Sequence, residues 1–278
     1  MTPGQPLMDE PPLIDIRNAT IWRGETRVFD NLTLTIARHE RVAILGPNGS
    51  GKTTLLKAIN RELYPVERDG SWLRILGRDR CNVWELRRHI GLVSHDLQQR
   101  YRPATTALEV VLSGFLASIG VHGMLREQIS ADRIAAAHDI LAELGIAELA
   151  DTPLRSMSTG QQRRCLLGRA LVHRPHTLIF DEPTSGLDFA ASFDYLARVR
   201  AFARDGCDII IVTHHLNEIP PEVGRVVLLD RGTIAADGPK AAVLVPDLLS
   251  RVYGTAIAVA EVDGHYLAYP GGPEPAKT

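Results

Sequence analysis

The sequence is poor in cysteine and in long apolar runs. Its three cysteines, Cys81, Cys165 and Cys207, are widely separated and form no CxxC pair. An odd number of isolated thiols argues against a disulfide framework or a zinc site and favours a reducing compartment. No apolar run approaches the roughly 18 residues that a membrane-spanning helix needs. If the protein serves a membrane process, we therefore expect another chain to cross the bilayer.

Neither sign of charge is in large excess. Lys and Arg total 31 and Asp and Glu total 33, so the net charge of −2 gives no support to broad nucleic-acid binding. The first twelve residues contain four prolines and lack the basic and apolar regions of a signal peptide. We expect residues 1–12 to be a disordered tail. Residues 258–278 are expected to be a C-terminal extension whose Pro/Gly-rich end, residues 270–278, is disordered.

What is present is typical of a soluble globular protein. The 278 residues are 45% hydrophobic and 23% charged, which is enough for one large α/β unit or about two domains. Short apolar or alternating runs predict strands, and residues 54–59 have helical character. The predicted strands cover residues 32–36, 42–45, 90–93, 177–180, 208–212 and 226–229.

A stretch rich in Ala, Leu and Glu, at about residues 106–149, has helical spacing instead. Strands, a helical segment and strands again are typical of an α/β core with an inserted helical subdomain. No internal repeat is visible, so we expect one copy of this core.

Residues 46–53 read GPNGSGKT and fit the phosphate-loop pattern G-x-x-x-x-G-K-[ST] without a mismatch. Such a loop wraps backbone N–H groups around phosphates, and the helix that follows adds the positive potential of its N-terminus. We expect Lys52 to reach the β- and γ-phosphates and the Thr53 hydroxyl to bind Mg²⁺. A dinucleotide fingerprint fits poorly, because no third glycine stands at the required place.

Two carboxylates, Asp181 and Glu182, directly follow the apolar run 177–180. Ligands of open α/β sheets bind at the carboxyl ends of the strands, so we expect both side chains beside the phosphate loop. Asp181 is predicted to hold Mg²⁺, and Glu182 to polarise the attacking water.

Further motifs resemble those of ABC-type ATPases. Residues 156–162 (SMSTGQQ, here called the signature segment) resemble the family's LSGGQ signature, and residues 185–188 (SGLD) resemble its D-loop. His214, after Thr213, resembles its switch histidine, and Trp22 stands where the family has an aromatic residue that stacks on adenine. The motifs occur in family order and cover about residues 13–240.

This resemblance implies an α/β fold, a P-loop NTPase core of the ABC-cassette type with an antiparallel β subdomain and an inserted α-helical subdomain at about residues 96–165. The ATPase domain would span residues 13–257. It implies ATP and Mg²⁺ as cofactors. It also implies a homodimer in which two cassettes face each other head to tail, with ATP between the phosphate loop of one and the signature segment of the other.

The family's roles carry over to matching positions of this sequence. The catalytic residues would be Glu182, His214 and Lys52, and the metal would be held by Thr53, Asp181 and His95. The residues implied to bind the nucleotide are Trp22, Gly46, Pro47, Asn48, Gly49, Ser50, Gly51, Lys52, Thr53, Thr54, Ser158, Gly160 and Gln161.

The sequence departs from the family at two places. Thr159 replaces the first glycine of the signature pair and restricts the backbone there. His95 stands where the family has the glutamine of the loop between core and helical subdomain, and an imidazole titrates near neutral pH whereas an amide does not. Gln98 or Gln99 could take that position through a shifted loop.

A single cassette without a spanning segment resembles a separate ATPase subunit that docks on a transmembrane permease, at the cytoplasmic face of the cell membrane. Residues 106–114 and 247–254 resemble segments of importers for iron–siderophore, haem and cobalamin, which also implies a solute-binding protein and no nucleic-acid partner. The competing interpretation is a soluble ATPase in regulation, repair or translation. A small-molecule kinase is disfavoured, because the signature segment and His214 would have no role.

Overall fold

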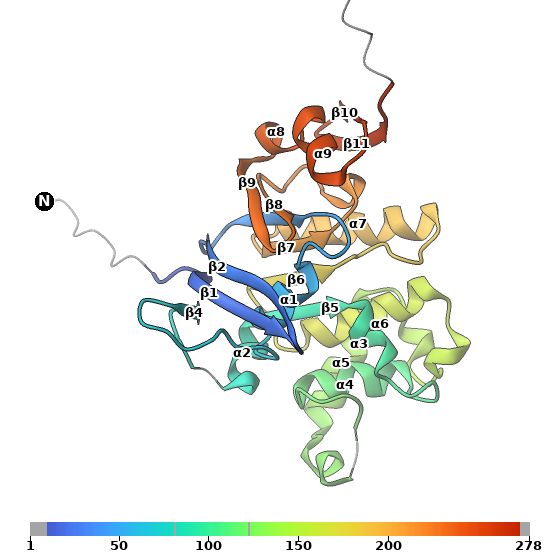
Figure 1. The fold of residues 1–278 in the computed structure, drawn as a ribbon. Helices are drawn as coiled ribbons and strands as arrows, with labels where there is room; N and C mark the ends of the chain where they lie inside the picture. The colour runs from blue at the N-terminus through green and yellow to red at the C-terminus, as the bar shows by residue number, and fades with distance from the viewer. Residues whose placement is uncertain (1–9, 81, 122, 273–278) are drawn as a thin grey trace, which may run out of the picture. The chain divides into compact units, whose positions relative to one another are not determined.

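The computed structural model describes residues 10–80, 82–121 and 123–272 (Figure 1). These residues belong to two compact units, which are described in turn. The first draws on Met1–Cys81, Gly224–Val259 and Tyr269–Thr278, and the second on Asn82–Val223 and Ala260–Ala268. The disorder expected at the two ends concerns mostly residues 1–9 and 273–278, which lie outside the described residues.

The first unit contains a three-stranded antiparallel sheet in the order β2-β1-β4. β1 (Ile14–Arg23) pairs with β2 (Thr26–Ile36) on one side and with β4 (Trp72–Ile75) on the other. Ile14 and Ile16, two residues apart on β1, have no exposed surface, as expected for one face of a strand. This sheet is the antiparallel β subdomain that the resemblance implies.

The same unit contains β3 (Arg41–Leu45), which runs parallel to β8 (Arg225–Asp230), while β9 (Thr233–Pro239) is antiparallel to β8. The last four residues of β3 are buried, which explains the unbroken apolar run in the sequence. The helices of this unit are α1 (Lys52–Ile59), α8 (Lys240–Val243) and α9 (Pro246–Tyr253). The two strands β10 (Ile257–Val262) and β11 (His265–Pro270) pair with each other, and their residues are divided between the two units.

Three parallel strands form the sheet of the second unit. β6 (Thr177–Asp181) pairs with β5 (Ile90–Ser94) on one side and with β7 (Asp208–Thr213) on the other. The backbone N–H of Glu182 donates to the carbonyl of Val212 at 2.8 Å, so the pairing extends one residue beyond β6. The carboxyl ends of β6 and β7 therefore emerge side by side, and the segments that follow them start as neighbours.

Helices pack closely around one another in the second unit. A Cβ atom on Gly114 would lie 2.3 Å from the carbonyl oxygen of Arg169, so only glycine allows α4 to approach α6 this closely. The helices of this unit are α2 (Val83–His89), α3 (His95–Gln99), α4 (Ala107–Phe115), α5 (Ala131–Glu143), α6 (Thr159–Leu171), α7 (Phe189–Arg204) and four short 3₁₀ helices, η1 (Gly123–Gln128), η2 (Ala147–Leu149), η3 (Leu154–Ser156) and η4 (Leu216–Glu218).

The strands predicted from the sequence and the helix after the phosphate loop are all confirmed, with boundaries that differ by up to two residues except in β2, which begins earlier. Among the described residues, every helix is too short or too polar to cross a bilayer.

Candidate functional site

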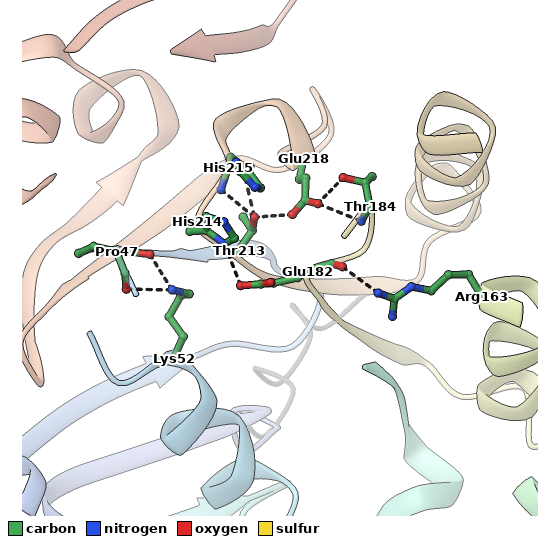
Figure 2. A network of polar contacts seen from close by, with 10 residues as sticks. Pro47, Lys52, Arg163, Glu182, Thr184, Thr213, His214, His215 and Glu218 are labelled. Atoms are coloured by element: carbon green, nitrogen blue, oxygen red, sulfur yellow. Dashed lines mark hydrogen bonds and ion pairs between the residues drawn. The ribbon is translucent and has the colours of Figure 1, made fainter. Parts of the chain in front are cut away.

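The phosphate loop links β3 to α1 in the first unit. Gly51 adopts a φ of 111°, and a Cβ atom there would lie 2.6 Å from the Phe29 ring, so this turn requires glycine. The Lys52 ammonium donates to the carbonyl oxygens of Gly46 at 2.7 Å and Pro47 at 3.0 Å (Figure 2). The loop thus curls around the amine of its own lysine, and its shape is held by backbone atoms.

The other predicted nucleotide-binding residues of this unit differ in exposure. Thr54 and Ser50 are buried, and the Ser50 backbone carbonyl accepts from Gly232 at 3.0 Å. Thr53, in the first turn of α1, is exposed. The Trp22 side chain lies near the end of β1 and is 44% exposed, so a flat ligand can reach its ring.

In the second unit, Glu182 follows β6 with a left-handed backbone, at a φ of 46°. Its carboxylate lies 2.8 Å from Nδ1 of His214, which follows β7 (Figure 2). An ionised carboxylate only accepts hydrogen bonds, so Nδ1 carries a proton and Nε2 points elsewhere as acceptor or, in the imidazolium, as donor. Both side chains are nearly a third exposed, which leaves the pair accessible to water.

A second carboxylate, Glu218, is fully buried behind this pair. It accepts from the backbone N–H of Thr184 at 2.9 Å, from the Thr184 hydroxyl and from the Thr213 hydroxyl. Thr213 Oγ1 in turn accepts from the N–H of His215 at 2.9 Å. The segment after β6 and the last residue of β7 are therefore joined through one side chain from η4.

Arg163 supports the same turn from α6. Its guanidinium has no exposed surface and donates to the carbonyl oxygens of Glu182 at 3.5 Å and Ser185 at 3.3 Å. Burial lowers its pKa, while nearby groups that include Asp181 and Glu218 favour its charged form. The side chain therefore sits as a buried cation beneath a cluster of carboxylates.

The signature segment forms the N-terminus of α6. Ser158 caps the helix by accepting from the N–H of Gln161 at 3.3 Å, and the Gln161 side chain accepts from the N–H of Ser158 at 2.9 Å. This reciprocal pair is a capping box, which gives both residues a structural reason to be there. Thr159 does not have a positive φ, so its backbone conformation does not require glycine and a threonine causes no strain at this position.

His95 lies at the first residue of α3, which corrects its expected place in a loop. Ser94 caps this short helix by accepting from the N–H of Leu97 at 3.2 Å. The pKa of His95 lies below its ordinary value, because its protein surroundings partly desolvate it and Arg163 repels its charged form. Gln98, which with Gln99 is one of the two alternatives from the sequence, donates to the side chain of Gln162 at 2.5 Å.

Two of the three predicted metal ligands, each considered by itself, offer oxygen, the donor atom that Mg²⁺ prefers. In nucleotide sites this ion takes one or two protein oxygens and completes its shell with phosphates and water. The exposed hydroxyl of Thr53 and the partly exposed carboxylate of Asp181 are ligands of that type. The imidazole of His95 offers nitrogen, which Mg²⁺ accepts less readily.

Sequence reasoning missed Glu218 and Arg163 as members of the polar network. Glu218 stands four residues after His214, between the apolar Leu216 and Ile219, which are both buried. A lone acid among buried apolar residues is the signal that could have drawn attention to it. Arg163 is one of two adjacent arginines, a pair typical of a solvated face, yet its side chain is completely buried.

A model of the ABC transporter family matches residues 29–185. Over 252 residues the chain is 33% identical to an uncharacterized ABC transporter ATP-binding protein of Bacillus subtilis, covering 89% of this chain and 93% of that protein. It is 35% identical over 229 residues to a glutamine transport ATP-binding protein of Escherichia coli (81% and 91% covered). It is 30% identical over 260 residues to a hemin import ATP-binding protein of Bradyrhizobium diazoefficiens (91% and 92% covered).

Solved structures share the fold. A putative metal-chelate type ABC transporter in an inward-facing conformation matches with a TM-score of 0.73 at 21% identity, over 92% of this chain and 96% of that one. A dimeric bacterial ABC transporter cassette matches with a TM-score of 0.66 at 27% identity, over 81% and 98%. The phosphate loop, the carboxylate after β6 and the histidine after β7 thus lie in a chain whose sequence and fold both match ABC transporter cassettes. The chain belongs to the ABC transporter family as an ATPase cassette.

Proposed function

We propose that the chain is the ATP-hydrolysing subunit of an ABC importer, which dimerises head to tail and drives a separate transmembrane permease. The observation that carries the hydrolytic role is the 2.8 Å contact between Nδ1 of His214 and the carboxylate of Glu182. In this proposal Glu182 takes the proton of the attacking water, and His214 holds Glu182 in place and contacts the γ-phosphate. Catalysis of phosphoryl transfer rests mainly on such positioning and on charge neutralisation.

The remaining roles follow the sequence motifs. Residues 46–54 cradle the phosphates of ATP through backbone N–H groups and Lys52, and Trp22 stacks on adenine. Thr53 and Asp181 hold Mg²⁺, with His95 near its shell. Bound there, the ion neutralises phosphate charge.

Ser158, Gly160 and Gln161 contact the γ-phosphate bound by the other subunit. The capping box supports this role, because it fixes the start of α6, and the N-terminus of a helix favours anions such as phosphate. The similarity to a dimeric cassette at 27% identity supports a dimer of this chain.

The cargo is proposed to be a metal chelate or a related small solute, delivered by a solute-binding protein. Similarity to a hemin import protein and to a cobalt import protein supports an importer of this class. Similarity to a glutamine transport protein supports transport without favouring this cargo. Two segments that resemble those of metal-chelate importers favour this cargo. Residues 106–114 begin with the capping box of Thr106 and Glu109 at the start of α4, and residues 247–254 cover most of α9 and its C-cap.

The proposal places the chain in the cytoplasm on the inner face of the cell membrane, without a nucleic-acid partner. The test is to purify the tagged chain from its own cells, to identify any permease that co-purifies, and to reconstitute both in liposomes. Permease-dependent stimulation of ATP hydrolysis, abolished by Glu182→Gln, is the expected result. Recovery of ribosomes or nucleic acid in place of a permease would support a non-transport ATPase and overturn the importer assignment.

A further inference from the structure

Glu218 is the least explained charged group of the polar network. Its side chain has no exposed surface, and none of the recognised motifs includes it. Burying a carboxylate is costly unless hydrogen bonds replace its water, and an apolar residue of similar volume often serves stability as well. A fully buried acid beside Glu182 and His214 therefore calls for a role other than stability.

The geometry of its hydrogen bonds suggests that role. One carboxylate oxygen accepts from the N–H of Thr184 at 2.9 Å and from the hydroxyl of the same residue. The other accepts from the hydroxyl of Thr213. Thr184 stands two residues after Glu182, and Thr213 immediately precedes His214. One carboxylate thus connects the two segments that present the reacting pair (Figure 2).

A carboxylate is suited to this connection because both of its oxygens accept. An amide of the same shape has one accepting oxygen, and its NH₂ group would face a donor on one side. The connection also matters because Glu182 adopts a left-handed backbone at a φ of 46°, which a non-glycine residue keeps only when its surroundings hold it. Two contacts supply that support: Arg163 donates to the carbonyl oxygen of Glu182, and Glu218 accepts from the N–H of Thr184.

We propose that Glu218 is a positioning residue for ATP hydrolysis, which fixes the Glu182 carboxylate and the His214 imidazole relative to each other. The inference rests on the proposed role of Glu182 as the base. Glu218 itself touches neither ATP nor the attacking water; it acts through the two segments that it joins.

The test compares Glu218→Gln with Glu222→Gln in the complete chain. Glu222 lies four residues further along and pairs with Arg200 at 3.1 Å and Arg204 at 2.9 Å, so it is a matched carboxylate outside the network. We expect Glu218→Gln to lower kcat roughly 10- to 100-fold, as small misplacements of reacting groups do, with KM for Mg-ATP unchanged. Glu222→Gln should keep the wild-type kcat. Equal rates for the two variants would overturn the inference.

A double-mutant comparison separates positioning from stability. In a Glu182→Gln background there is no base left to position, so Glu218→Gln should cause no further loss of kcat. The same fold-loss in both backgrounds would indicate a structural role and overturn the inference. If Glu182→Gln alone keeps the wild-type rate, the proposed base is wrong, which is a distinct failure.

A second variant covers the case in which Glu218→Gln does not fold. Thr213→Val keeps the shape of the side chain and removes the hydroxyl on the His214 side only. We expect it to lower kcat in the same direction but by less, again without a change in KM. A wild-type kcat for folded Thr213→Val would contradict the proposed connection.

Discussion

The phosphate loop and the segments after β6 and β7 position their functional side chains in different ways. In the loop, a glycine with a φ of 111° and the carbonyls of Gly46 and Pro47 set the shape, and these carbonyls hold the side chain of Lys52. After the two strands, positions are set by side chains, because Glu218 and Arg163 hold the backbone that presents Glu182. The first arrangement is local in sequence, and the second joins residues up to 34 positions apart.

The difference predicts different tolerance to substitution. A loop whose shape is set by its backbone should lose its function when a side chain is added at a glycine. A network of side chains should lose its function when one oxygen is replaced. Binding of ATP is expected to depend on the loop, and the chemical step on the network. The following predictions test this division, beginning with the largest expected effect.

Removal of the loop's charge should have the largest effect. Lys52→Ala removes the amine that the loop holds among its carbonyls, and with it the point charge for the β- and γ-phosphates. We expect both Mg-ATP binding and hydrolysis to be lost, measured by calorimetric titration and phosphate release. Lys57→Ala, in the last turn of the same helix, is the control and should keep both. Wild-type affinity in Lys52→Ala would remove the loop from the nucleotide site.

Replacement of one oxygen in the network should separate binding from chemistry. We expect Glu182→Gln to lower turnover by roughly 10² to 10⁴, the usual contribution of a general base, with ATP affinity unchanged. The amide oxygen can still accept from His214, so the contact survives while the base is lost. Size-exclusion chromatography should then show an ATP-bound dimer. Normal turnover in this variant would exclude Glu182 as the base.

Replacing a glycine by alanine should disrupt the phosphate loop but should be tolerated in the signature segment. In Gly51→Ala the new Cβ would lie 2.6 Å from the Phe29 ring on a strained backbone, and we expect Mg-ATP affinity to fall roughly 10- to 100-fold. In Gly160→Ala the nearest atom is 3.4 Å away, so the isolated subunit should fold and bind Mg-ATP normally. Thermal unfolding and nucleotide titration check both variants. Equal losses of Mg-ATP affinity in the two variants would contradict the expected difference between the two regions.

The smallest effect is expected at His95, next to the network. Its pKa in the folded protein lies below 6.5, so below that pH the unfolded chain binds more protons than the folded one. The free energy of unfolding should therefore decrease further for the wild type than for His95→Gln as the pH falls through this range. Urea denaturation of both proteins at about pH 7.5 and about pH 5 measures the difference. Parallel changes would show that His95 has its ordinary pKa in the folded state.

The sequence by itself determined six of the strands, the phosphate loop and the family, whereas β1, β4, β9, β10 and β11 were not predicted from it. Each rests on residues close together in the chain, such as the apolar run of β3 followed by the loop pattern, whose physical meaning is local. It also placed Asp181 and Glu182 at the end of β6, because a buried run followed by two acids has one simple interpretation.

Only the tertiary structure decided how Glu182 is held. Arg163, Thr184, Thr213 and Glu218 come from four segments, and no spacing in the sequence says that they meet. The capping box of the signature segment is different, because Ser158 and Gln161 stand only three residues apart and this spacing is readable in the sequence. The physical reason is that a hydrogen bond between distant residues depends on strand order and packing, whereas a turn of the backbone depends on the residues within it.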